Sequence, residues 1–373
     1  MTDHSLDNTA TLRQFCQTLP KVELHAHLNG SLSPTTLAKL RTLKSDKYPE
    51  LATLCWPQQQ NGGSVGLAEF FPLFRHIYKL TEDEQAVKMA TWDVLEEFQR
   101  DGVRYLELRS TPRAVESTGM TKETYVRAVL AAMDGWTKHQ QLSPQNQHKH
   151  GVMVVRLILC VDRRESLEEA LATVQLALRY HRTTSTLADA LCHVVGVDLC
   201  GNPEVGDPST WTPAFQLAKS KGLKLTVHLG EVPYNLAEGL TLLAWQPDRV
   251  GHATLLKPAT RAALYKGKIP VEVCLTSNVQ SQTVASYDDH FIKEFYRVGH
   301  PFVPCTDDKG VFGCSLTDEY ERLATVLQLD YTQLFNISRQ CLGFIFDEDV
   351  ELQRQLQAEW TTWEQSCELL RSE

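Results

Sequence analysis

Two histidines stand two positions apart in the stretch LPKVELHAHLNG, residues 19–30, at the end of an apolar run typical of a β-strand. Alternate side chains of a strand point to the same face, so His25 and His27 would present their imidazoles together. Two neutral imidazole nitrogens suit zinc or a similar divalent ion. The pair alone could be accidental, and a metal site needs further ligands from elsewhere in the chain.

Further candidate ligands follow other apolar runs, in TVHLGE and in PCTDD. The ligands of one zinc ion would then be His25, His27, His228 and Asp307. Such an ion would lower the pKa of a bound water to near 7, and Glu231 would act beside it as a general acid or base. His252 and Asp308 would orient or deprotonate the water and hold the substrate, although either could instead be structural. The set favours metal-assisted hydrolysis.

The elements that must position these residues form a regular series, in which short apolar runs alternate with longer segments of helical periodicity. The strand-like runs are 21–28, 103–110, 152–162, 193–200, 223–230, 248–253, 269–277 and 301–307. The helical segments are 81–100, 164–182, 210–221, 236–245, 258–266, 289–298 and 315–328. The first helix begins with Thr81-x-x-Glu84, which is typical of a capping box.

Eight strands alternating with helices predict an α/β fold of the (β/α)8 TIM-barrel type, with a doubly wound sheet as the alternative. Polar residues end all eight runs, where a barrel places its active site. We expect one domain, with a helical lead-in over 1–18, the barrel over 19–346 and a C-terminal helix over 347–373. Two segments interrupt the series, 45–66 and 141–151; the first would be part of a lid or a plain surface insertion.

The composition narrows the classes of partner. The chain has 373 residues, is 42% hydrophobic and carries a formal net charge of −9 without a basic run. These features disfavour nucleic-acid polymers and anionic membranes, and they favour a small-molecule partner. No signal peptide or membrane span is visible, so we expect a cytosolic protein. The ten cysteines are scattered without a C-x-x-C pair, which favours buried reduced thiols.

The ordered motifs HAHLNG, LCGNP, VHLGE, RVGHA, CLTSN and CTDD resemble the adenosine deaminase family over residues 19 to 346. The resemblance implies a (β/α)8 barrel with one zinc ion and hydrolytic removal of an exocyclic amine from a 6-aminopurine. It implies that Glu231 protonates ring nitrogen N1 and that His252 assists the water. It also implies that Asp308 hydrogen-bonds to N7 and that the backbone N–H of Gly201 lies near N3.

Within the family the chain is most similar to the adenosine deaminase-like branch, through LELRSTPR, the triplet DRR at 162–164, and SNVQSQTV. Adenosine-type members usually carry Asp where this chain has Asn29, and a neutral amide would not repel a phosphate. The resemblance implies a purine monophosphate substrate, with N6-methyl-AMP converted to IMP and methylamine. We expect the protein to be a monomer. The substrate-binding residues would be Asn29, Tyr78, Ser110, Thr111, Pro112, Arg113, Asp162, Gly201 and Asp308; close members of the branch tend to have His at position 78.

Two other functions remain open at this stage. One is deamination of free adenosine or adenine, which would not require a 5′-phosphate. The other is a barrel that binds nucleotides without chemistry, although the complete ligand set and Glu231 count against it.

Overall fold

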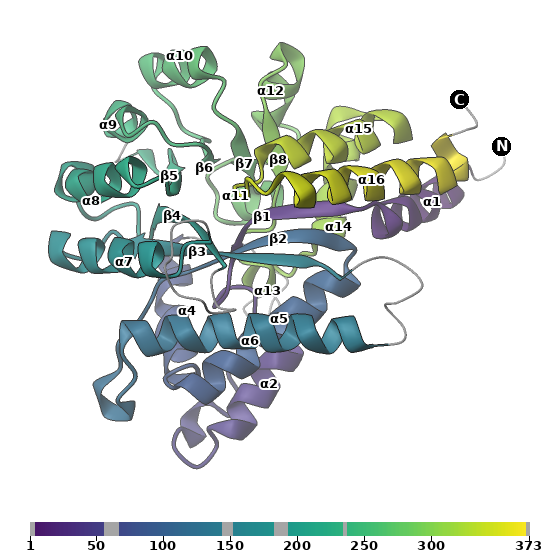
Figure 1. Cartoon of the computed structure of the whole chain (residues 1–373). Helices are drawn as coiled ribbons and strands as arrows, with labels where there is room; N and C mark the ends of the chain where they lie inside the picture. Colours follow the sequence, from purple (N-terminus) through teal and green to yellow (C-terminus); the bar gives the residue numbers. More distant parts are fainter. Residues whose placement is uncertain (1–3, 56–66, 144–151, 183–192, 234–236, 371–373) are drawn as a thin grey trace.

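The computed structural model describes residues 4–55, 67–143, 152–182, 193–233 and 237–370. Eight parallel strands form one sheet in the order β1 to β8, and helices surround it (Figure 1). The strands are β1 Lys21–His27, β2 Val103–Ser110, β3 Val154–Asp162, β4 Val194–Cys200, β5 Lys224–Leu229, β6 Val250–His252, β7 Val271–Val273 and β8 Phe302–Pro304. Nearly every strand residue is buried, as in sheets covered on both faces.

The sheet closes on itself just beyond β8. Ala26 pairs in parallel with Asp307. The backbone N–H of His27 donates to the Asp307 carbonyl at 3.0 Å, and the Asp307 N–H donates to the His25 carbonyl at 2.7 Å. This closure confirms the (β/α)8 barrel and excludes the doubly wound sheet. It also places one candidate metal ligand, Asp307, directly against two others.

Helices cover the outside of the barrel and both chain ends. The α-helices are α1 His4–Thr18, α2 Pro34–Leu43, α4 Leu67–Leu80, α5 Glu84–Arg100, α6 Lys122–Leu142, α7 Leu167–Arg179, α8 Pro208–Ser220, α9 Gly239–Ala244, α10 Pro258–Gly267, α11 Leu275–Gln280, α12 Ile292–Val298, α13 Lys309–Phe312, α14 Leu316–Leu327, α15 Tyr331–Cys341 and α16 Val350–Ser366. Short 3-10 helices span Pro49–Leu51, Glu116–Thr118, Leu342–Phe344 and Glu368–Leu370.

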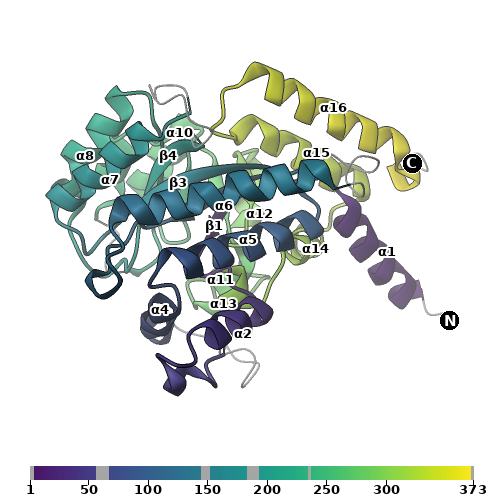
Figure 2. The same cartoon turned by 60° about the horizontal axis from the view of Figure 1, so that its bottom comes forward.

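The first and last long helices pack against the same side of the barrel (Figure 2). The ring of Phe15 in α1 meets Trp363 in α16 edge to face, with ring centroids 5.4 Å apart. Trp360 in α16 donates from its indole nitrogen to the hydroxyl of Ser338 in α15 at 3.0 Å. None of the helices in the described ranges is long and apolar enough to cross a lipid bilayer.

Two predicted features differ from the structure, and some helices lie where none was predicted. The run 269–277 was expected to be one strand, but β7 ends at Val273 and residues 275–280 form α11. The capping box at Thr81 is wrong, because Asp83 caps α5 by accepting from the Ala86 N–H at 2.9 Å. The 21-residue helix α6 was not predicted.

Most of the two interrupting segments lies outside the described residues. The structure describes residues 45–55 of the first segment and residues 141–143 of the second.

Candidate active site

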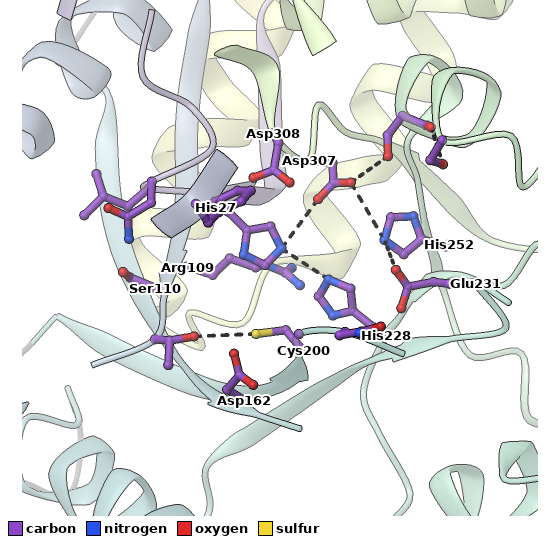
Figure 3. Close-up of a pocket in the computed structure, with 18 of the residues that line it drawn as sticks. His27, Arg109, Ser110, Asp162, Cys200, His228, Glu231, His252, Asp307 and Asp308 are labelled. Carbon is purple, nitrogen blue, oxygen red and sulfur yellow. Dashed lines mark hydrogen bonds and ion pairs between the residues drawn. The ribbon is translucent and has the colours of Figure 1, made fainter. Parts of the chain in front are cut away.

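A cavity of about 520 Å3 opens at the carboxyl ends of the strands. Its lining includes twelve of the residues singled out from the sequence: His27, Asn29, Tyr78, Ser110, Thr111, Asp162, Gly201, His228, Glu231, His252, Asp307 and Asp308. His25 lies just beneath it, fully buried, and Pro112 and Arg113 are outside the lining. Seven of the lining residues belong to β1 to β6, which shows how the barrel gathers distant parts of the chain (Figure 3).

Four side chains meet at the base of the cavity with atoms that can hold a metal ion. These atoms belong to His25, His27, His228 and Asp307, and they all lie within 4.8 Å of one another. One carboxylate oxygen of Asp307 lies 3.3 Å from Nε2 of His25 and 3.5 Å from Nε2 of His27. The Nε2 atoms of His27 and His228 are 3.2 Å apart. In Figure 3 the ring of His27 points toward both Asp307 and His228.

This geometry fits a divalent cation. Ligand atoms about 2.1 Å from a tetrahedral zinc ion lie about 3.4 Å from one another, close to the separations found here. Nε2 of His25 is buried and has no hydrogen-bond partner. The lone pairs of His27 and His228 would repel at 3.2 Å unless a proton or a cation lay between them. All four residues are therefore suited to one shared ion.

The two more deeply placed histidine ligands are oriented from behind by carboxylates. Nδ1 of His25 lies 2.6 Å from Glu272. Nδ1 of His228 lies 3.2 Å from Asp198 and 3.0 Å from the carbonyl of Leu199. Each contact fixes a proton on Nδ1 and leaves Nε2 for a metal, which is the usual arrangement behind metal-bound histidines.

Buried charges around the ligands favour the same conclusion. Arg109 donates to Asp198 at 3.1 Å and to Glu272 at 2.9 Å, and Arg249 donates to Glu272 at 2.7 Å and to Glu107 at 2.5 Å. With Asp307, four buried carboxylates thus lie beside two guanidinium groups in this cluster, so the carboxylates outnumber the guanidinium groups by two. Because uncompensated buried charge is costly, a divalent cation would complete the balance.

Glu231 and His252 face the four candidate metal ligands from the opposite wall. His252 Nε2 lies 3.7 Å from a carboxylate oxygen of Glu231 and 3.9 Å from Asp307. Burial raises the pKa of Glu231, although the nearby His228 opposes the rise. Burial lowers the pKa of His252 to about 3, so its imidazole is neutral near pH 7. The wall therefore offers a carboxyl group poised to carry a proton and a neutral histidine.

The two adjacent aspartates have opposite protonation tendencies. Burial alone would raise the pKa of Asp307, but the surrounding histidines hold it well below its usual range. Burial raises the pKa of Asp308 well above its usual range, and the charge of Asp307 adds to that rise. Asp307 is thus suited to bind a cation, and Asp308 is suited to donate a hydrogen bond.

Backbone strain is concentrated at the same place. His252 and Asp307 adopt φ angles of 61° and 59°, in the left-handed region that L-residues rarely occupy. Gly201 has φ 99°, and a Cβ atom there would lie 2.9 Å from the carboxylate of Asp162. Glycine is therefore required at position 201 for the chain to approach the cavity so closely.

The sequence profile of the adenosine deaminase family matches residues 20–358. The N6-methyl-AMP deaminase of Homo sapiens is 40% identical over 353 residues, covering 93% of this chain and 94% of that protein. The N6-mAMP deaminase of Arabidopsis thaliana is 39% identical, with coverage of 92% and 96%. A solved structure of arabidopsis ADAL complexed with IMP superposes with a TM-score of 0.83 at 37% identity, covering 95% of this chain and 99% of that one. The chain belongs to the adenosine deaminase family. Members of this family are metal-dependent deaminases.

The cavity wall that we expect to bind phosphate in this adenosine deaminase family barrel is polar. Arg113, however, lies behind this wall and does not line the cavity. Ser110 Oγ lies 2.7 Å from the hydroxyl of Tyr125, and Asn29 Nδ2 lies 3.4 Å from the same hydroxyl. Arg113 donates to the Thr81 carbonyl and hydroxyl, both at 2.8 Å, and its guanidinium stacks 4.3 Å from the ring of Tyr78. Arg113 thus braces the wall from outside the cavity.

Sequence reasoning placed Arg109, Ser277 and Asn278 among the polar residues at the strand ends but did not assign them roles as supports of the site. It missed other residues that shape the site: Asp198 and Glu272 as supports, and Arg75 and Arg164 as cations on the cavity lining. Arg164 donates to the carboxylate of Asp162 at 2.8 and 2.6 Å, while 62% of its side chain stays exposed. A signal for two of the supports was present, because Asp198 and Glu272 interrupt the apolar runs VGVDLC and VEVCL. A charged residue inside a buried strand must have a partner.

Proposed function

We propose that the protein is a zinc-dependent hydrolase that converts N6-methyl-AMP to IMP and methylamine. The observation that carries the proposal is that Glu231 and His252 face the His/Asp ligand set within one cavity. The choice of substrate is supported by the relatives at about 40% identity that are named N6-methyl-AMP deaminases. It is also supported by the related arabidopsis ADAL structures complexed with IMP and with GMP.

The metal ligands would be His25, His27, His228 and Asp307. When bound there, a zinc ion would lower the pKa of a water molecule to about 7. Glu231 would give its proton to N1 of the purine as the water oxygen bonds to C6, and the resulting carboxylate would take a proton from that water. The bond between C6 and the exocyclic nitrogen would then break as Glu231 passes this proton to the departing methylamine, and Glu231 would regain a proton from the hydroxyl on C6 as the carbonyl of IMP forms. The raised pKa of Glu231 suits this exchange, because a general acid works best with a pKa near the operating pH.

Asp308 and Gly201 would orient the base. N7 of a purine is a hydrogen-bond acceptor, so Asp308 must be protonated to pair with it, in accord with its raised pKa. Its Oδ1 is buried without a partner, which leaves the carboxyl group available to a ligand. The backbone N–H of Gly201 would lie near N3. The two contacts would hold C6 toward the metal ligands.

The phosphate would lie against the polar wall formed by Asn29, Ser110 and Thr111, beside Tyr78. A carboxylate at position 29 would repel a phosphate dianion, whereas the Asn29 amide would donate to it. Arg164 and Arg75 would add positive charge to the cavity lining, and Arg113 would hold the wall in place from behind.

A substrate panel tests the proposal. Purified protein with measured zinc content is assayed on N6-methyl-AMP, AMP and N6-methyladenosine. We expect about one zinc per chain and a clear preference for N6-methyl-AMP. Equal turnover of nucleoside and nucleotide would favour a deaminase without a phosphate requirement, and protein without metal or turnover would favour a nucleotide-binding barrel.

Asn29→Asp tests the phosphate wall within the same assay. The added carboxylate should raise KM for N6-methyl-AMP by roughly 10- to 150-fold, corresponding to about 1.5–3 kcal/mol, with a smaller effect on N6-methyladenosine. Equal losses on both substrates would place the phosphate elsewhere.

We further propose that the protein acts as a monomer in the cytosol and that its partner is the purine monophosphate rather than a nucleic-acid polymer or a membrane. The net charge of −9 supports this choice. Light scattering of the purified protein and fractionation of cells that express it would test these two points.

A further inference from the structure

A chain of hydrogen bonds leads to Nδ1 of His252, the ring nitrogen opposite the one that lies near Glu231. It passes from the backbone N–H of Ile292, at the start of α12, through the side chains of His290 and Asn278 to the imidazole of His252. The three side chains are 1%, 2% and 3% exposed, respectively. With so little solvent, each donor in the chain must meet an acceptor.

The direction of the chain is fixed at its backbone end. An N–H of a peptide can only donate, and the Ile292 N–H lies 3.1 Å from Nδ1 of His290. Nδ1 of His290 is therefore unprotonated. Burial lowers the pKa of His290 to about 3, so the ring carries one proton, on Nε2. His290 thus caps one of the first N–H groups of α12, which have no partner within the helix.

The donor from His290 also fixes the orientation of the Asn278 amide. Nε2–H of His290 donates to Oδ1 of Asn278 at 3.2 Å. The amide nitrogen of Asn278, 3.1 Å from Nδ1 of His252, must donate in turn. A flipped amide would set two donors against each other at one end, so the orientation of Asn278 is determined. Nδ1 of His252 is therefore an acceptor, and an imidazole whose Nδ1 is unprotonated carries its proton on Nε2.

That proton points into the active site. Nε2 of His252 faces the carboxylate oxygens of Glu231, at 3.7 Å, and Asp307, at 3.9 Å, both of which are acceptors. In Figure 3 the ring of His252 lies on the same side of the cavity as Glu231, across from His27.

We infer that His290 and Asn278 are positioning residues that hold His252 as the Nε2–H tautomer, so that His252 donates a hydrogen bond to the oxygen that attacks C6 instead of taking a proton from it. The identity of that oxygen rests on the proposed function, but the tautomer does not. The helix α11 serves both halves of the site, because its Ser277 donates to Asp307 at 2.7 Å while the next residue, Asn278, donates to His252.

The tautomer can be measured directly on the zinc-loaded full chain. Long-range 15N–1H correlation spectra of histidine-labelled protein, assigned by comparison with His252→Gln, distinguish a protonated Nε2 from a protonated Nδ1. We expect His252 to be protonated at Nε2 without substrate. A spectrum with the proton on Nδ1 overturns the inference, whatever the substrate of the enzyme is.

Variants of His290 test the chain behind His252. His290→Phe keeps a planar ring but cannot accept from Ile292 or donate to Asn278, so we expect mixed tautomers of His252 and a kcat about 10- to 100-fold lower, with unchanged zinc content. His290→Gln retains an acceptor and a donor, and it should restore the Nε2–H tautomer and most of the turnover. His300→Phe is the control, because His300 is a buried histidine just beyond the other end of α12, and its Nε2 lies 3.0 Å from the Ile269 carbonyl oxygen.

Asn278→Asp tests the direction of the chain. A carboxylate can only accept, so it would draw the proton of His252 to Nδ1 and lower kcat while KM changes little. An unchanged tautomer and kcat in both His290→Phe and Asn278→Asp would contradict the inference. Should the wild-type protein fail to deaminate N6-methyl-AMP while the tautomers respond as expected, the proposed function would fail and the positioning chain would stand.

Discussion

The surroundings of Glu231 determine whether its carboxyl group can carry a proton near neutral pH. Its place three residues after a predicted metal ligand was enough to suggest acid–base chemistry from the sequence. The carboxyl group lies in the cavity lining, 3.7 Å from His252, and burial raises its pKa. The sequence could not indicate that burial, because the surrounding walls come from distant strands.

Replacing Glu231 by Gln should preserve zinc content and thermal stability but reduce kcat by ~10²–10⁴-fold, because the amide keeps the shape of the side chain and cannot transfer a proton. Zinc analysis and steady-state kinetics on N6-methyl-AMP measure the two effects. The exposed Glu348→Gln serves as control. A loss of less than about tenfold would assign proton transfer to another group.

Asp198 is a support that sequence reasoning did not identify, because its role depends on a contact with His228 on the neighbouring strand. Asp198→Asn keeps an oxygen near Nδ1 of His228 but removes the charge that orients and polarises the ring. We expect zinc affinity to fall by roughly 10- to 100-fold. Competition with a chromophoric chelator measures this affinity, and Asp288→Asn, whose side chain is 95% exposed, is the comparison variant. Equal affinities of Asp198→Asn and wild type would remove Asp198 from the metal site.

At the scale of elements, the alternation of strands and helices was visible in the sequence, but the ends of the elements were not. The apolar run 269–277 reads as one strand, yet it contains β7 and the start of α11. Periodicity cannot separate a short buried strand from a buried helical turn. The difference matters for function, because only the helix lets the consecutive residues Ser277 and Asn278 reach Asp307 and His252.

The buried residue Glu319 in α14 holds α11 in this place, since it accepts from the Thr276 N–H at 3.2 Å and from the Thr276 hydroxyl. Burial raises the pKa of Glu319 to about 7 from an ordinary value of 4.5. The folded protein then keeps a proton that the unfolded chain loses between pH 4.5 and 7. The free energy of unfolding should therefore fall over this range as pH rises, by on the order of 3 kcal/mol from this residue.

Urea unfolding of zinc-loaded wild type and Glu319→Gln at pH 5 and pH 7 checks the effect. Wild type should lose unfolding free energy between pH 5 and pH 7 because Glu319 ionises. Gln does not titrate, so this loss should be smaller in Glu319→Gln. The same pH dependence in both proteins would show that Glu319 is already ionised in the folded state.

At the scale of the whole molecule, the barrel explains why the sequence order of the motifs was so informative. Eight parallel strands carry the ends of widely separated segments to one rim, so residues as distant as His25 and Asp307 become neighbours. The charge balance inside the barrel was not predictable, because Arg109 and Arg249 read as ordinary polar residues in their strands. Their pairing with Glu272 becomes evident only when β2, the residue before β6, and β7 come together around one axis.

Because the carboxylates around the ligand set outnumber the guanidinium groups, we expect a bound cation to stabilise the fold. Removal of the metal by a chelator should lower the unfolding temperature by several degrees, since a ligand at 100 times its Kd contributes about 2.7 kcal/mol. Added zinc should restore the original value, with a shift that grows with the free zinc concentration. His228→Ala lacks one ligand, so its unfolding temperature should respond much less to either treatment. Calorimetry of both proteins before and after chelation decides the point: if wild type unfolds at the same temperature with and without zinc, the ligand set does not bind the ion in the folded protein.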